Sequence, residues 1–136
     1  MALKYNNDQH KEYIDMTTRI GQKWIDVFDG RTEFYDATFW DLLTKVWYSD
    51  TPVRKTDALK FMTGIKSAHT AGKYVEQALA EDLLAETVNP GDGRSKLLTL
   101  SPRMRERLDR FFDGAISEVR KSNHEINVKG PSPEDP

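Results

Sequence analysis

The chain has 136 residues, of which 38% are hydrophobic and 31% charged, and this composition indicates one folded domain with a modest core. No stretch approaches the roughly 18 apolar residues of a membrane span, and no signal peptide is recognisable, so we expect a cytoplasmic protein. The absence of cysteine excludes disulfides and thiol catalysis, and a net charge of −2 argues against a general polyanion binder.

The first predicted element is a helix over residues 8–30. Asp8 is a favourable N-cap, Gly30 is a favourable terminator, and apolar side chains recur between them every three or four residues. A second helix, rich in aromatic residues, is expected over about 36–49. It ends before Pro52, because the residue that precedes a proline is disfavoured in the helical conformation.

Two further helices are predicted close together in the next segment. A short one begins near Thr56 and is broken by Thr63 and Gly64. A longer one follows over about residues 67–84, with apolar residues along one side. Two helices joined by a short turn that contains glycine are typical of a helix-turn-helix.

Residues 84–88 and 94–100 predict a two-stranded hairpin, since apolar residues alternate with polar ones on either side of a turn. The turn contains Gly91 and Gly93, both of which we expect to be free to adopt positive φ. The fold class is therefore mainly α with a small β-hairpin.

The last predicted element is a helix over residues 102–122. Ser101 is a good N-cap and Pro102 is favourable at the first helical position, where its missing N–H costs nothing. The remaining residues, 123–136, are polar and rich in proline, so we expect a flexible tail. We expect the whole chain, residues 1–136, to form a single domain.

The hairpin sequence NPGDGRSKLLTLSP, residues 89–102, is similar to the wing of the MarR family of winged helix-turn-helix regulators. Asp92 and Arg94 stand where the family has an Asp-x-Arg pair. The resemblance implies that Asp92 pairs with Arg94 and orients its guanidinium group. Asp82 stands where the family usually has a glycine, so we expect that corner to be built differently.

Upstream, SAHTAGKYVEQ resembles the recognition helix of the same family, with Thr70, Lys73 and Val75 at the characteristic positions. The resemblance implies that residues 36–100 form a winged helix-turn-helix. It also implies that helices 8–30 and 102–122 form the interface of a homodimer that binds a pseudo-palindromic site on double-stranded DNA.

The predicted DNA-binding residues combine short polar side chains near a helix N-terminus, which favours phosphate, with cations on the helix and the wing. They are Ser67, His69, Thr70, Lys73, Tyr74, Arg94, Lys96 and Arg103. Members of this family often bind small aromatic ligands, so we expect an effector pocket that involves the three tryptophans, Trp24, Trp40 and Trp47.

The leading functional hypothesis is a dimeric, sequence-specific transcriptional regulator, a repressor that a ligand or signal releases. The alternative is a winged-helix protein-interaction module without strong DNA binding, favoured by the acidic balance, by Gly93 on the wing and by Glu76 on the proposed recognition helix. No catalytic constellation or cofactor motif is recognisable. The three histidines are scattered, so neither an enzyme nor a metal site is expected.

Overall fold

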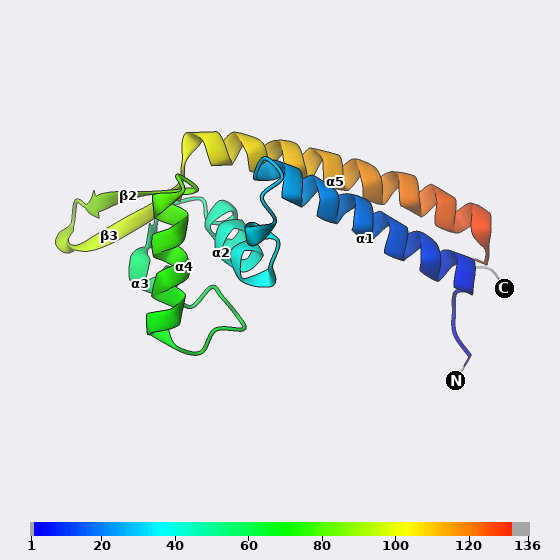
Figure 1. Ribbon diagram of the computed structural model, residues 1–136, viewed down its shortest axis with the longest axis horizontal. Coiled ribbons are helices and arrows are strands. Elements are labelled where there is room, and N and C mark those ends of the chain that lie inside the picture. Colours follow the sequence, from blue (N-terminus) through cyan, green and yellow to red (C-terminus); the bar gives the residue numbers. More distant parts are fainter. Residues whose placement is uncertain (1, 132–136) are drawn as a thin grey trace. The chain divides into compact units, whose positions relative to one another are not determined.

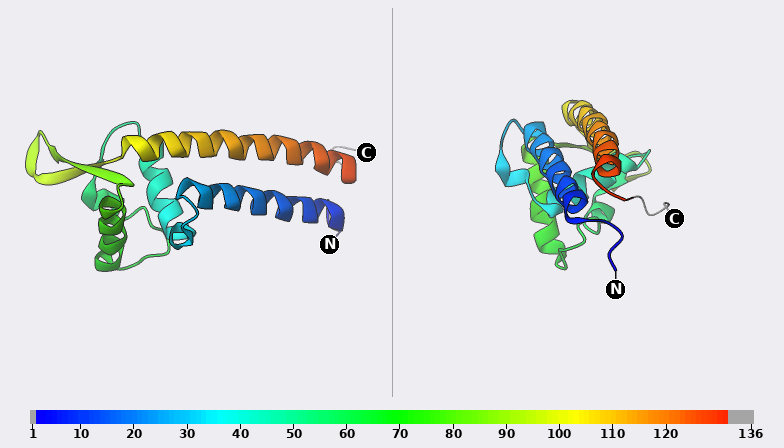
Figure 2. Two further views of the ribbon diagram at one scale, coloured as in Figure 1. Left: turned by 45° about the horizontal axis from the view of Figure 1, so that its top comes forward. Right: turned by 90° about the vertical axis from the view of Figure 1, so that its right-hand side faces the viewer.

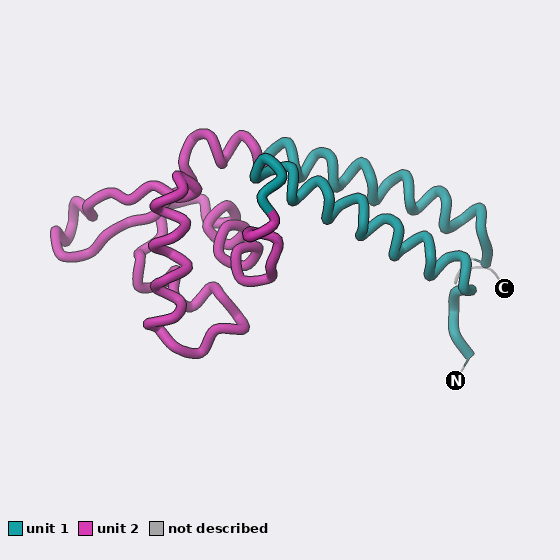
Figure 3. The backbone as a smooth tube through the Cα atoms, in the orientation of Figure 1, with its two compact units in different colours: residues 1–31, 109–136 teal, residues 32–108 magenta. Residues whose placement is uncertain are grey.

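The computed structural model describes residues 2–131 and divides into two compact units (Figures 1 and 3). Unit 1 contains residues up to 31 and from 109 onward, and unit 2 contains residues 32–108. The elements, in chain order, are α1 (Asn7–Val27), a 3-10 turn η1 (Thr32–Phe34), α2 (Ala37–Tyr48), β1 (Val53–Arg54), α3 (Lys55–Ala58), α4 (Ala68–Ala80), β2 (Leu84–Asn89), β3 (Asp92–Leu100) and α5 (Pro102–Lys129). None of the helices in residues 2–131 combines the length and the apolar character needed to cross a membrane.

In unit 1, α1 lies antiparallel beside the second part of α5 (Figures 1 and 2). Helix α1 begins with a capping box: the Asn6 side chain accepts the N–H of Gln9 at 2.8 Å, and the Gln9 side chain accepts the N–H of Asn6 at 2.9 Å. The same two side chains also bind the end of α5. Asn6 donates to the Lys129 carbonyl, and Gln9 donates to the carbonyls of Ile126 and Pro131.

This contact between the two helix ends depends on Gly130. A Cβ atom at that position would lie 2.3 Å from Nδ2 of Asn6, far inside van der Waals contact. A side chain at position 130 would therefore displace the Asn6 and Gln9 side chains from these contacts.

The middle of unit 1 contains a buried charge cluster around Glu12, whose side chain is only 6% exposed. Its carboxylate contacts Lys129 Nζ at 2.9 Å and Arg19 Nη2 at 3.1 Å, and accepts the Ser122 hydroxyl at 2.8 Å. Hydrogen bonds from Lys129, Ser122 and Arg19 lower the pKa of Glu12 from 4.5 to about 2. Arg19 also contacts Glu118 at 2.7 Å, so the cluster joins α1 to α5 in two places.

Unit 2 packs α2, α3 and α4 with a three-stranded antiparallel sheet in the order β1-β3-β2. Leu98 on the central strand β3 is fully buried and lies between Val53 on β1 and Glu86 on β2. Leu42 and Leu43 of α2 are also fully buried. These residues give unit 2 a core of its own.

The observed elements follow the predicted order, with differences at their ends. Helix α1 ends at Val27 rather than near residue 30, because Asp29 and Gly30 both have positive φ and turn the chain away. Strand β1 was not predicted, since two residues are too short to show an alternating pattern. Helix α3 is also shorter than predicted and ends at Ala58.

The largest difference is at the end of α5, which runs to Lys129 instead of residue 122. No glycine or proline occurs between residue 122 and Gly130, and the side chains of Asn6 and Gln9 bind the final carbonyls. The first part of the predicted flexible tail, 123–136, is therefore helical. Residues 132–136 lie outside the described part of the chain.

Candidate nucleic-acid interface

Helix α4 presents the predicted recognition residues on an exposed face. Ser67 is its N-cap, and the Ser67 hydroxyl accepts the N–H of Thr70 at 3.3 Å. His69, Thr70 and Lys73 are exposed, whereas the opposite side, with Val75 fully buried, packs into unit 2. Ser67 thus orders the end of the helix whose backbone N–H groups and dipole favour an anion.

Tyr74 differs from the other predicted contacts because it is half-buried. Its ring packs edge-to-face on Phe39 of α2, with ring centroids 5.2 Å apart. This contact of Tyr74 therefore joins α4 to α2.

Two residues of α2 that the sequence analysis missed fix the loop before α4. Lys45 Nζ donates to the Phe61 carbonyl at 2.6 Å and to the Thr63 hydroxyl at 3.2 Å. Asp41 accepts the N–H of Thr63 at 3.1 Å. The only sequence signal for this clamp is an acid and a base four residues apart on one helix face.

The wing is the hairpin of β2 and β3, with an irregularity in register between Val88 and Asn89. The Asn89 side chain accepts the N–H of Gly91 at 3.0 Å and donates to the Ser95 hydroxyl at 3.1 Å. Neither Gly91 nor Gly93 uses the positive φ that glycine is free to adopt. The asparagine contacts and the irregular register close the turn with ordinary backbone angles.

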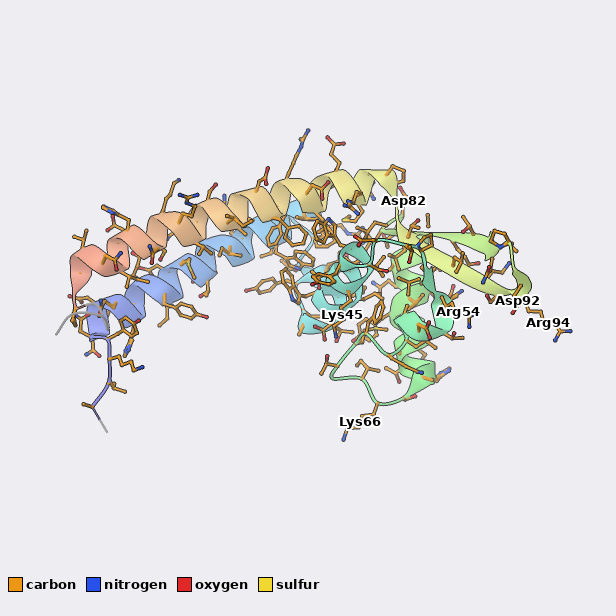
Figure 4. All side chains as sticks on the ribbon, turned by 180° about the vertical axis from the view of Figure 1, so that it is seen from behind. Lys45, Arg54, Lys66, Asp82, Asp92 and Arg94 are labelled. Carbon is orange, nitrogen blue, oxygen red and sulfur yellow. The ribbon has the colours of Figure 1, made fainter. Side chains whose placement is uncertain are left out.

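Asp92 orders the tip of the wing through the backbone. Its carboxylate accepts the backbone N–H of Arg94 at 3.0 Å, and no ion pair with the Arg94 guanidinium is present among the described residues. The Arg94 side chain is exposed and extends away from the hairpin tip (Figure 4). Lys96, also on β3, is half-buried opposite Val88.

Arg54 is an exposed cation beside the wing that the sequence analysis missed. It lies on β1, paired in register with Leu97 of β3 (Figure 4). Strand β1 is too short to be recognised in the sequence, so its pairing with β3 was not predicted. The position of Arg54 beside the wing was missed for the same reason.

One residue at the corner between α4 and the wing has the left-handed backbone conformation that glycine adopts most easily. Asp82 has φ of 58°, so the expectation of a differently built corner is wrong in this respect. The Ser101 hydroxyl donates to the Asp82 carbonyl at 2.7 Å and accepts the Met104 N–H at 3.1 Å. Asp82 adopts this conformation at a cost that glycine would not carry.

Arg103, predicted to contact phosphate, is bound to this corner. Its guanidinium donates to the carbonyls of Glu81 at 3.2 Å and Asp82 at 3.3 Å, and lies 3.5 Å from the Asp82 carboxylate. Arginine at the C-terminal end of a helix binds carbonyls that lack a helical partner. The contacts of Arg103 in this structure therefore complete the end of α4.

A cluster of three charges joins α3, α4 and β2. Lys55 Nζ lies 2.7 Å from a carboxylate oxygen of Glu76 on α4 and 2.7 Å from one of Glu86 on β2. These contacts, that with Glu76 first, raise the pKa of Lys55 above its ordinary value. Glu76 is three residues from Lys73, on the same exposed side of the helix.

The three tryptophans expected at a ligand pocket divide between the units. Trp24, in unit 1, is buried and packs edge-to-face with Phe28 and Phe111. Trp40 and Trp47 belong to α2 in unit 2, and the Arg105 guanidinium lies 4.9 Å from the centre of the Trp47 ring. Two pockets of unit 1 are lined by residues other than tryptophan. An effector pocket at the three tryptophans stays a prediction.

No protein-family model and no curated protein sequence matches this chain. Solved structures do share its fold. A transcriptional regulator from Thermotoga maritima has a TM-score of 0.59 at 16% identity, covering 89% of this chain and 82% of that protein. A MepR mutant from S. aureus, bound to an oligodeoxyribonucleotide, has a TM-score of 0.57 at 15% identity over 85% of each chain.

A MarR family transcriptional regulator from Streptomyces coelicolor, in complex with DNA, has a TM-score of 0.52 at 18% identity, covering 85% of this chain and 71% of that one. The chain therefore has the winged-helix fold of MarR family regulators. The predicted fold class is confirmed, with a third short strand, β1, in its sheet.

Proposed function

We propose that the protein is a sequence-specific double-stranded DNA-binding transcriptional regulator that acts as a homodimer in the cytoplasm. The observation that carries the proposal is the exposed surface of unit 2. It combines the capped N-terminus of α4, the exposed Lys73 and the exposed Arg94 at the wing tip. A helix of this kind fits the major groove, and an arginine on a wing fits the narrow minor groove.

The neighbours support this proposal because structures of the same fold, from S. aureus and Streptomyces coelicolor, were solved with an oligodeoxyribonucleotide or DNA bound. We further propose that the regulator is a repressor released by a small aromatic ligand or another signal.

The homodimer is proposed from the exposed apolar surface of unit 1. Both α1 and α5 contribute large apolar side chains that are 40% exposed or more, and such surfaces mark interfaces. Those on the two helices are Tyr13, Ile14, Ile116, Val119 and Val128, with Tyr5 just before α1. A two-fold dimer would present two α4 helices to a pseudo-palindromic site. Light scattering at micromolar concentration should give twice the chain mass, and a monomer would contradict the dimer.

The test of DNA binding is selection of random duplexes by the purified protein, followed by titration of the enriched sequence at several salt concentrations. Lys73→Ala and Arg94→Ala should each weaken binding about tenfold and reduce the salt slope by about 1 if each residue contacts a phosphate. Lys4→Ala, which removes an exposed lysine from unit 1, is the control and should bind as the wild type does.

One feature favours a second candidate, a protein-interaction module. Unit 2 carries equal numbers of basic and acidic residues, and Glu76 lies on the exposed side of α4. Weak DNA binding that does not depend on the DNA sequence, and that neither Lys73→Ala nor Arg94→Ala changes, would support this candidate and overturn the DNA-binding proposal.

A further inference from the structure

The Lys55 cluster, defined as Lys55 with Glu76 and Glu86, links the two parts of the proposed DNA-binding surface. Glu76 belongs to α4, the proposed recognition helix, and Glu86 belongs to β2, a strand of the wing. One ammonium group at the start of α3 contacts both carboxylates at 2.7 Å. Helix and wing are thus bridged by a single cation.

The two carboxylates would repel each other without this cation. Both approach the same nitrogen at hydrogen-bond distance, so they lie close together, and like charges at such separations are unfavourable. Glu76 would also lie near bound DNA, because it is 65% exposed and one turn from Lys73. An uncompensated carboxylate there would repel the phosphates that Lys73 is proposed to contact.

Lys55 itself is poorly placed to contact phosphate. Its side chain is 30% exposed, and the ammonium already donates to two carboxylates. A phosphate would have to displace one of them. Lys55 should therefore affect DNA binding indirectly, through its contacts with Glu76 and Glu86.

We propose that Lys55 is a positioning residue for DNA binding: it holds Glu76 of the recognition helix and Glu86 of the wing together and balances one of their two negative charges. This inference rests on the proposed function. In the cluster, Glu76 of α4 is connected through Lys55 to Glu86 of the wing. The negative charge beside Lys73 is thereby reduced, which favours an anionic partner.

The experiment is a mutant cycle on the enriched duplex with four proteins: wild type, Lys55→Met, Glu76→Gln/Glu86→Gln, and the triple variant. Lys55→Met should weaken binding about fivefold to tenfold, because it leaves two carboxylates uncompensated. Lys60→Met is the matched control, since it removes an exposed lysine of unit 2 outside the cluster, and it should change affinity less than about twofold.

The decisive quantity is the gain in affinity from neutralising both glutamates, measured with and without Lys55. We expect a gain of about fivefold in the Lys55→Met background and less than about twofold when Lys55 is present. A lysine that contacts phosphate directly would give the opposite order, because neutral glutamines would release it for DNA. Equal gains in both backgrounds, or the larger gain with Lys55 present, would overturn the inference.

Thermal unfolding and light scattering on the same four proteins show whether each variant remains folded and in the same oligomeric state. If Lys55→Met fails to fold, Lys55→Gln, alone and combined with Glu76→Gln/Glu86→Gln, provides the same comparison. Failure of the wild type to enrich any duplex would overturn the proposed function and this inference together. Wild-type binding that depends on Lys73, with no coupling in the cycle, would overturn this inference alone.

Discussion

Each unit contains a cluster of charged side chains, and the central residue of the cluster has the opposite sign in the two units. In unit 1 one carboxylate, Glu12, contacts two cations, Lys129 and Arg19. In unit 2 one ammonium, Lys55, contacts two carboxylates, those of Glu76 and Glu86. The central carboxylate of unit 1, Glu12, is 6% exposed, although its partners Arg19 and Lys129 are 44% and 37% exposed. The central ammonium of unit 2, Lys55, is 30% exposed, and its partners are 30% and 65% exposed.

The difference in burial between Glu12 and Lys55 gives the two charge clusters different roles. A buried charge cannot lose its partners cheaply, because water does not replace them, so the Glu12 cluster should hold α1 against α5. Exposed pairs contribute little to stability because water and salt screen them. The Lys55 cluster should therefore matter mainly through the charge that it presents to a partner.

The largest effect is expected from breaking the buried cluster with Glu12→Ala. Arg19, Lys129 and the buried Ser122 hydroxyl lose their common acceptor, and the melting temperature should fall by on the order of 10 °C. Calorimetry of the variant beside Asp15→Ala, which removes an exposed carboxylate from the same helix, measures the difference. Equal melting temperatures for the two variants would contradict the role of the cluster.

The pH dependence of the same site gives a second test. The folded-state pKa of Glu12 is about 2 against an ordinary value of 4.5, so its stabilisation is complete above about pH 4.5 and is lost as pH falls towards 2. Urea unfolding should show a large stability difference between wild type and Glu12→Gln at pH 7, and a smaller one at pH 3. A difference that stays constant between these pH values would show that the charge of Glu12 is not responsible.

Lys55→Met should have a much smaller effect on stability than Glu12→Ala. The pairs are partly exposed, so we expect the free energy of unfolding to change by less than about 1 kcal/mol. Urea titration of this variant and of Lys60→Met measures it. A loss as large as that of Glu12→Ala would remove the distinction between the two clusters.

The smallest effect, of opposite sign, is expected at Asp82, an acidic residue whose side chain is 71% exposed beside Arg103. Asp82→Gly removes a weak surface pair but relieves the positive φ, so the free energy of unfolding should rise by about 0.5 kcal/mol. Asp82→Ala removes the same pair without that relief and should be less stable than the glycine variant. The reverse order would show that the Asp82–Arg103 pair outweighs the backbone conformation.

The order of elements was predictable from the sequence because local patterns decide it. The Ser67 cap, the polar turn before β3 and the apolar periodicity of the helices are each visible within a few residues. The exposed positions of Lys73 and Arg94 followed from the same patterns. Their contacts with DNA stay predictions.

The charge clusters were not predictable, because their members are far apart in the sequence. Ser122 is 110 residues from Glu12, and Lys129 is 117 residues away. The contacts of Arg103 with the α4 corner were not predictable for a similar reason, because they depend on how β3 returns the chain to that corner. A contact of Arg103 with phosphate stays a prediction. The clamp from Lys45 also requires the packing of α2 on the loop before α4.

The contact between Asn6 and the Lys129 carbonyl, 123 residues apart, has a consequence for folding kinetics. Unit 1 is assembled from both ends of the chain, whereas unit 2 is one continuous segment. Contacts between distant segments carry a large loop-closure entropy and form slowly when the intervening chain is flexible. Unit 2 can fold from contacts within its own continuous segment, which are less distant in sequence than those of unit 1, and it shortens that loop when it folds. We therefore expect hydrogen exchange during refolding to show protection in α4 and β3 before protection in α1.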